Sequence, residues 1–195
     1  MVVVLVTLAV LSGGGLVLAT TYEPLEEGSW TGADSIAPPS LFMRIDQDPF
    51  GSGAMWVYCY TPNGRFAWGT TLRNAGPLPV TILGGDPGPL GGVDLSRTNS
   101  FRLVDFALAP TQPPGTADPG HLPTLTPVTL QSGDEVSIWA RFEDGGLATQ
   151  SGATSFVRSL WVRYSVLGVE RAAEVSLRNG VGVESTGASC PAPST

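Results

Sequence analysis

The residue types that most often do chemistry are sparse in this chain of 195 residues. The one histidine, His121, lies between Gly120 and Leu122 in a proline-rich stretch. A serine-type hydrolase would place this imidazole beside a nucleophile, yet the sequence contains no Gly-x-Ser-x-Gly motif. A lone histidine in such a loop is usually solvated. We therefore expect a protein that is not an enzyme, and the alternative is an exported hydrolase that uses His121.

Paired carboxylates are the next candidates, and each pair flanks a turn or a strand end, where solvated acids are common. The pairs are Asp46 with Asp48, Asp134 with Glu135, and Glu143 with Asp144. Asp46 and Asp48 lie in the oxygen-rich segment IDQDPFGSG, which suits a hard cation such as calcium, but the closing Glu of an EF-hand loop is missing. We expect no metal site and no cofactor; a metal-binding protein that uses the Asp46 and Asp48 loop belongs to the alternative.

Two cysteines occur, Cys59 and Cys190. An exported chain meets an oxidising compartment, so one disulfide between them is the simplest expectation. On the chain-entropy model, a bridge that closes a loop of roughly 130 residues stabilises the fold by about 4 to 5 kcal/mol. The alternative is a buried thiol at Cys59 and an unrelated Cys190 in the tail.

The candidate binding residues are Trp139, Trp161, Arg141 and Arg163. Both tryptophans alternate out of phase with the aliphatic residues of their segments, so we expect them to be exposed neighbours on one sheet. Arg141 and Arg163 each follow two residues later. Aromatic rings beside guanidinium groups make a coherent contact surface.

Many short strands must position these residues, because the chain has 25 Gly, 17 Pro and only 14% charged residues. Alternating apolar segments bounded by turn residues predict strands at residues 54–60, 65–73, 80–82, 101–109, 128–130, 135–142, 156–167 and 169–178. We expect 54–60 and 65–73 to form a hairpin, and the last two segments to form another about Gly168. Val104, Phe106 and Leu108 should share one face. This spacing predicts an all-β fold, an Ig-like or fibronectin-III-like two-sheet sandwich of seven or eight strands.

An uncharged run at residues 2–19 precedes these strands. As a helix it would be about 27 Å long, enough for a thin bilayer core. Glycines 13–15 interrupt it, and Val17 and Ala19 suit cleavage before Thr20, as in a secretory signal. We expect a retained anchor at residues 1–19, with a cleaved signal peptide as the alternative, a stalk or leader at 20–49, the sandwich at 50–180 and a tail at 181–195.

The formal net charge is −7, with ten basic residues, all of them arginine. An acidic chain without basic clusters is a poor match for the phosphate backbone, so we expect no nucleic-acid partner.

Three segments carry a resemblance: NAGPLPVTILG, LQSGDEVSIWARF and VRYSVLGVERAAEVSL. Together they resemble an uncharacterised group of actinobacterial membrane-anchored Ig-like proteins over about residues 50–180. The resemblance implies one sandwich after an N-terminal hydrophobic helix, and a cysteine near the RF pair. Glu143 and Asp144 follow that pair here, so the group's disulfide pattern does not carry over.

We therefore expect a non-enzymatic extracytoplasmic module, held at the cell membrane by a single N-terminal span or else secreted. It would contact an envelope protein or glycan, or serve as a structural accessory of the envelope. The resemblance implies no activity.

Overall fold

The computed structural model describes residues 22–37, 42–45, 54–59, 63–85, 101–109, 118–144 and 154–184. Within these residues every regular element is a β-strand, so the predicted all-β class is confirmed. The predicted N-terminal helix and residues 185–195 of the predicted tail lie outside the described residues. Residues 181–184, also predicted as tail, instead belong to the last strand, because they pair with residues 56–59. Across the described ranges, no helix has the length and apolar character needed to cross a bilayer.

The described strands number ten, against seven or eight predicted. They are β1 (Leu25–Ala37), β2 (Phe42–Ile45), β3 (Met55–Cys59), β4 (Arg65–Asn74), β5 (Val80–Gly85), β6 (Phe101–Leu108), β7 (Val128–Leu130), β8 (Glu135–Asp144), β9 (Thr154–Val166) and β10 (Val169–Glu184).

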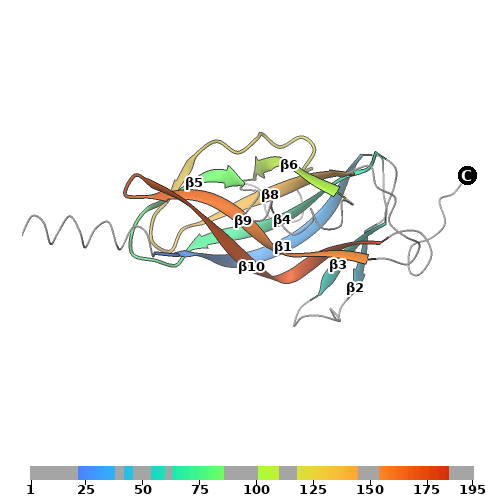
Figure 1. Cartoon of the computed structure of the whole chain (residues 1–195), viewed down its shortest axis with the longest axis horizontal. Helices are drawn as coiled ribbons and strands as arrows, with labels where there is room; N and C mark the ends of the chain where they lie inside the picture. The colour runs from blue at the N-terminus through green and yellow to red at the C-terminus, as the bar shows by residue number, and fades with distance from the viewer. Residues whose placement is uncertain are drawn as a thin grey trace, which may run out of the picture.

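The strands form two sheets, as predicted (Figure 1). One has four strands in the order β1-β4-β8-β6, and the other has six in the order β2-β3-β10-β9-β5-β7. The described pairings are antiparallel except that β3 runs parallel to β10. The predicted hairpin about Gly168 is confirmed as β9 and β10, whose pairing begins at Val166 and Val169.

Between the sheets lies one large apolar core. The four-stranded sheet contributes Phe66, Trp68, Leu72, Ile138 and Phe142, and the six-stranded sheet contributes Val80, Ile82, Leu160, Val162 and Tyr164. These side chains alternate along their strands, which is the period-2 pattern that the sequence shows. Burial of this apolar surface is the main force that holds the two sheets together.

The segments 54–60 and 65–73 do not form the predicted hairpin. β3 belongs to the six-stranded sheet and β4 to the four-stranded sheet. The chain therefore passes from one sheet to the other between these two strands, and the rings of Tyr58 and Phe66 stack with centroids 4.5 Å apart. Both segments alternate correctly for a hairpin, but alternation does not reveal the pairing partner.

The predicted stalk at residues 20–49 is also corrected. β1 pairs with β4 along most of its length, and β2 pairs with β3. The polar character that suggested a spacer has a physical reason, because β1 is an edge strand whose register is broken between Glu27 and Thr31. Edge strands with bulges often lack a regular apolar alternation.

A second irregularity changes the predicted face of β6. Leu103 pairs with Phe142 and Asp105 pairs with Arg141, so Val104 is an extra residue. Phe106 and Leu108 join the core as expected, whereas Val104 is 51% exposed. The bulge shifts the alternation by one residue and puts Leu103 against the core instead.

The proline-rich corner after β4 is held by the side chain of Asn74, which is fully buried. Its amide nitrogen donates to the carbonyl oxygens of Leu78 at 2.8 Å and Leu130 at 3.1 Å, and its amide oxygen accepts from the backbone N–H of Gly76 at 3.1 Å. The corner thereby connects β4 to β5 in the other sheet, as the predicted strand, turn, strand arrangement requires.

Candidate functional site

The four predicted binding residues do not form one surface. Trp139 and Arg141 lie on β8 in the four-stranded sheet, whereas Trp161 and Arg163 lie on β9 in the six-stranded sheet. Both tryptophans point away from the shared core, as their alternation predicts. The prediction of neighbours on one sheet is corrected, because alternation along a strand does not identify the sheet to which the strand belongs.

Trp139 is buried on the outer side of its sheet, with 3% of its surface exposed. Its ring meets Trp30 of β1 edge to face, with centroids 5.2 Å apart. Gly69 lies beneath both rings, and a Cβ atom there would be 2.7 Å from each ring. Trp30 is therefore part of a small outer cluster, which also contains Ala67, Ala107, Ala109 and Leu122.

Arg141 fastens a loop to this outer face. Its Nε and Nη2 atoms donate to the two carboxylate oxygens of Asp105, each at 2.5 Å. Its Nη1 donates to the carbonyl oxygens of Leu122 at 3.2 Å and Pro119 at 3.4 Å, and its Nη2 to the Thr124 hydroxyl at 3.2 Å. The hydrogen bonds with Asp105 raise the pKa of Arg141. Because its guanidinium N–H groups are engaged in these hydrogen bonds, Arg141 has a structural role: it connects the loop to the sheet.

Trp161 and Arg163 share the outer face of the six-stranded sheet. Trp161 is half-buried and is paired across strands with Glu174 of β10. The Arg163 side chain is 48% exposed and lies 3.5 Å from Glu170. Glu174 accepts a hydrogen bond from the Ser159 hydroxyl at 2.5 Å. An indole thus lies among exposed donors and acceptors on one sheet face.

His121 forms an ion pair with Asp118 in the loop that Arg141 fastens. The side chains are 88% and 60% exposed. The hydrogen bond from His121, together with that from the Gly120 N–H, lowers the pKa of Asp118. Such a pair has the chemistry of an imidazole oriented by a carboxylate, which is one part of a hydrolase site.

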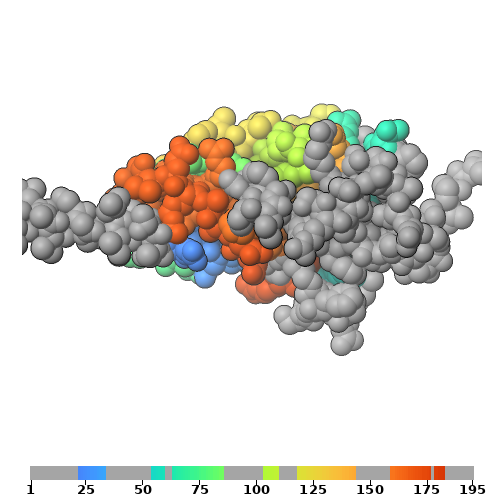
Figure 2. Space-filling view, in the orientation of Figure 1, coloured from blue at the N-terminus to red at the C-terminus, as the bar shows by residue number. Residues whose placement is uncertain are grey.

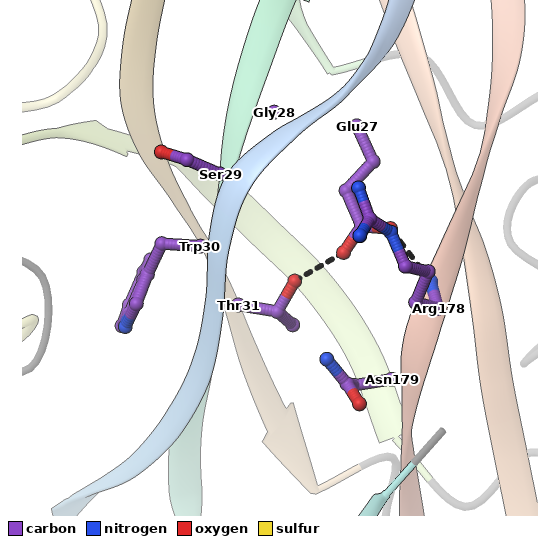
Figure 3. A pocket seen from close by; sticks show the side chains of 7 residues that line it. All are labelled: Glu27, Gly28, Ser29, Trp30, Thr31, Arg178 and Asn179. Carbon is purple, nitrogen blue, oxygen red and sulfur yellow. Dashed lines mark hydrogen bonds and ion pairs between the residues drawn. The ribbon is translucent and has the colours of Figure 1, made fainter. Parts of the chain in front are cut away.

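A small pocket lies where β1 and β10 meet, and the sequence did not indicate it (Figure 3). In β1 the three residues 28–30 lie opposite one residue of β4, and in β10 the four residues 177–180 lie opposite one of β9. The Glu27 carboxylate at the pocket is only 8% exposed. It accepts hydrogen bonds from the Thr31 hydroxyl and from the backbone N–H of Arg178, the latter at 2.7 Å.

This pocket has a volume of about 50 Å³, far below the roughly 300 Å³ at which small-molecule sites usually begin. The guanidinium of Arg178 lies 3.4 Å from Glu27, and Figure 3 shows Trp30 on the opposite side of β1. The Glu27 carboxylate has partners on both oxygens. We interpret the pocket as a structural feature, formed where the bulged parts of β1 and β10 pack against each other.

The remaining predicted residues have structural contacts or lie outside the described part. Asp134 accepts from the backbone N–H of Gln131 at 2.8 Å, and Glu135 from the Ser29 hydroxyl at 2.9 Å. Cys59 is buried on β3. Asp46, Asp48 and Cys190 lie outside the described residues. Among those described, no three His, Cys, Asp or Glu side chains gather as metal ligands.

Among solved structures, the CooA pilin subunit from enterotoxigenic Escherichia coli resembles this chain. The sequence identity is 9%, the match covers 77% of this chain and 100% of the pilin chain, and the TM-score is 0.30. At that score the likeness carries no argument about function. No family model matches the chain, and no curated protein matches it.

Proposed function

We propose that the chain is a non-enzymatic extracytoplasmic module that contacts an envelope protein or glycan through the outer face of its six-stranded sheet. Residues 2–19 hold it at the cell membrane, and the sandwich is of the Ig-like type that the sequence resembles. Trp161 and Arg163 are the central contact residues. Glu174, which pairs across strands with Trp161, is a third contact residue.

The observation that carries this proposal is the position of Trp161. Its strand neighbours Leu160 and Val162 are fully buried in the core, whereas Trp161 is turned outward and is only half-buried. Arg163 and Glu174 offer a donor and an acceptor beside it. Indole and guanidinium groups are enriched among residues that dominate binding energy, and an exposed ring flanked by polar groups also suits a sugar ring.

Binding to purified envelope material tests the proposal. The full chain, in detergent, is mixed with purified actinobacterial cell walls, or separately with isolated envelope proteins, and the bound fraction is measured. Trp161→Ala and Arg163→Ala should each weaken binding to one of these materials about tenfold, which corresponds to about 1.4 kcal/mol. Arg73→Ala is the matched control, because Arg73 is an equally exposed arginine with an acidic neighbour on the other sheet.

If the two Trp161 and Arg163 variants bind both materials as tightly as the wild type, this face is not the contact surface. The material that shows the loss identifies the partner as protein or glycan.

An exported hydrolase is the second candidate, favoured by the ion pair between His121 and Asp118. Turnover of ester or peptide substrates that is abolished by His121→Ala would support it. Turnover that is unaffected by this change, or no turnover by the wild type, would favour the contact module.

A further inference from the structure

Two uncharged turns lie side by side at one end of the sandwich. Thr81 of β5 pairs with Ser165 of β9, and the strands are antiparallel. Pro79, two residues before Thr81, therefore lies beside Leu167, two residues after Ser165. In Figures 1 and 2 the tip of the β9 and β10 hairpin projects at this end of the molecule.

The surface of these two turns is apolar. Ala75, Pro77 and Pro79 are exposed in the first turn, and Leu167 is 63% exposed in the second. Leu167 also has a φ of 52° and precedes Gly168, whose φ is 78°. A two-residue hairpin turn of this kind favours Asn followed by Gly. Leu is disfavoured there because of the backbone conformation, and also because its large apolar side chain is exposed to water. Contact with an apolar surface would explain its presence.

The chain enters the sandwich at the same end, at Tyr22. The Tyr22 carbonyl oxygen accepts hydrogen bonds from the Tyr164 hydroxyl at 3.0 Å and from Arg171 at 2.5 Å. Its own hydroxyl accepts from the backbone N–H of Leu78 at 3.1 Å, inside the first apolar turn. Burial raises the pKa of the Tyr164 hydroxyl. Tyr22 is therefore fixed to the folded domain.

The uncharged run at residues 2–19 ends only three residues before Tyr22. Three residues span at most about 11 Å when fully extended. A sandwich fixed at Tyr22 has no long spacer with which to move away from a membrane that holds residues 2–19. The end that carries Tyr22 must then face that membrane.

We propose that two of the turns at this end of the sandwich, residues 75–79 and 167–168, rest on the lipid bilayer, with the strands directed away from it. The inference depends on the proposed membrane attachment through residues 2–19. Leu167 and the prolines enter the headgroup region, and Tyr22 lies at the interface, where tyrosine is enriched. The arrangement keeps the outer sheet faces upright and accessible to partners.

Quenching by labelled lipids tests this orientation. The full chain is reconstituted into phosphatidylcholine and phosphatidylglycerol vesicles whose headgroups carry nitroxide quenchers. A fluorescent dansyl amino acid is placed at position 167 or 77, or at position 65 as the control. Arg65 is exposed at the opposite end of β4, about 30 Å away along a ten-residue strand. We expect quenching at positions 167 and 77 to be at least threefold stronger than at position 65.

Flotation of the vesicles separates the two possible failures. A chain that does not float with the vesicles contradicts the membrane attachment itself, and the orientation fails with it. A chain that floats but shows equal quenching at positions 77, 167 and 65 contradicts only the orientation. Position 77 keeps the test independent of the change at Leu167.

Discussion

Leu167 illustrates how one residue can oppose the local preference of the backbone. A left-handed conformation costs a residue with a Cβ atom about 1 kcal/mol, and Asn tolerates it better. We predict that Leu167→Asn raises the free energy of unfolding by about 0.5 to 1 kcal/mol, as measured by urea unfolding of the full chain in detergent.

The matched control is Val104→Asn. Val104 is also an exposed apolar residue, but it is not among the described residues with positive φ. It should give no stabilisation. A Leu167→Asn chain no more stable than the wild type would contradict the backbone argument.

Asn74 is the residue whose loss we expect to be most damaging to the proline-rich corner. Asn74→Ala removes three hydrogen bonds and leaves the carbonyl oxygens of Leu78 and Leu130 without this donor. Buried polar groups without a partner are costly, so we predict a loss of about 3 kcal/mol. Thermal unfolding measures it, with the exposed Ser132→Ala as the control, and equal melting temperatures for the two variants would contradict the prediction.

At the level of single residues, the sequence predicts well on which face of a strand a side chain lies. It predicts poorly what covers that side chain and which backbone conformation the residue adopts. Alternation correctly placed Val136, Ile138 and Phe142 in the core. It could not show that Trp139 is covered by Trp30, because the covering residue is distant in sequence and lies in a segment that resembles a spacer. The positive φ of Leu167 was also hidden, since Leu is not a turn residue.

Some strands and loops are held together by side-chain contacts that the alternation of apolar residues along the sequence does not reveal. The loop at residues 118–125 is fastened to β6 and β8 by Arg141, and the Leu125 N–H donates to the Phe106 carbonyl at 2.6 Å. We predict that Arg141→Ala lowers the free energy of unfolding by about 2 to 3 kcal/mol, because the carboxylate of Asp105 then loses the guanidinium group with which it pairs. Hydrogen exchange at Leu125 should become faster.

Arg141→Lys is the informative control, because it keeps the positive charge but loses the guanidinium group that donates to both carboxylate oxygens of Asp105. It should recover only part of the stability. An unchanged exchange rate at Leu125 in the Arg141→Ala chain would show that the loop is held by other contacts.

At the element scale, local pairing was predictable and distant pairing was not. The hairpin of β9 and β10 needs only a short turn, so its sequence identifies both strands. The pairings of β1 with β4 and of β2 with β3 bring an apparent leader into both sheets. Bulges in β1, β6 and β10 shift the alternation, so that a sequence pattern of period 2 fails there.

For the whole molecule, the parallel pair of β3 and β10 bears on the predicted disulfide. Glu184, at the end of β10, pairs with Cys59. Cys190 follows six residues later, and six residues can span about 20 Å. A bridge between the two cysteines is therefore within reach of the chain, and it stays a prediction.

Thiol labelling of the full chain tests this bridge. We predict that neither cysteine reacts with a maleimide before reduction under denaturing conditions, and that both react afterwards. Cys59→Ser should lower the stability by about 4 kcal/mol. Labelling of Cys190 in the unreduced chain would contradict the bridge.

An upright contact module attached to the membrane by its own N-terminal run should stay with the cell. Fractionation of a Gram-positive host that expresses the full chain, followed by the intact mass of the product, tests this attachment. We predict a chain in the membrane fraction, sensitive to external protease, whose mass includes residues 2–19. A chain in the medium that begins at Thr20 would contradict the attachment.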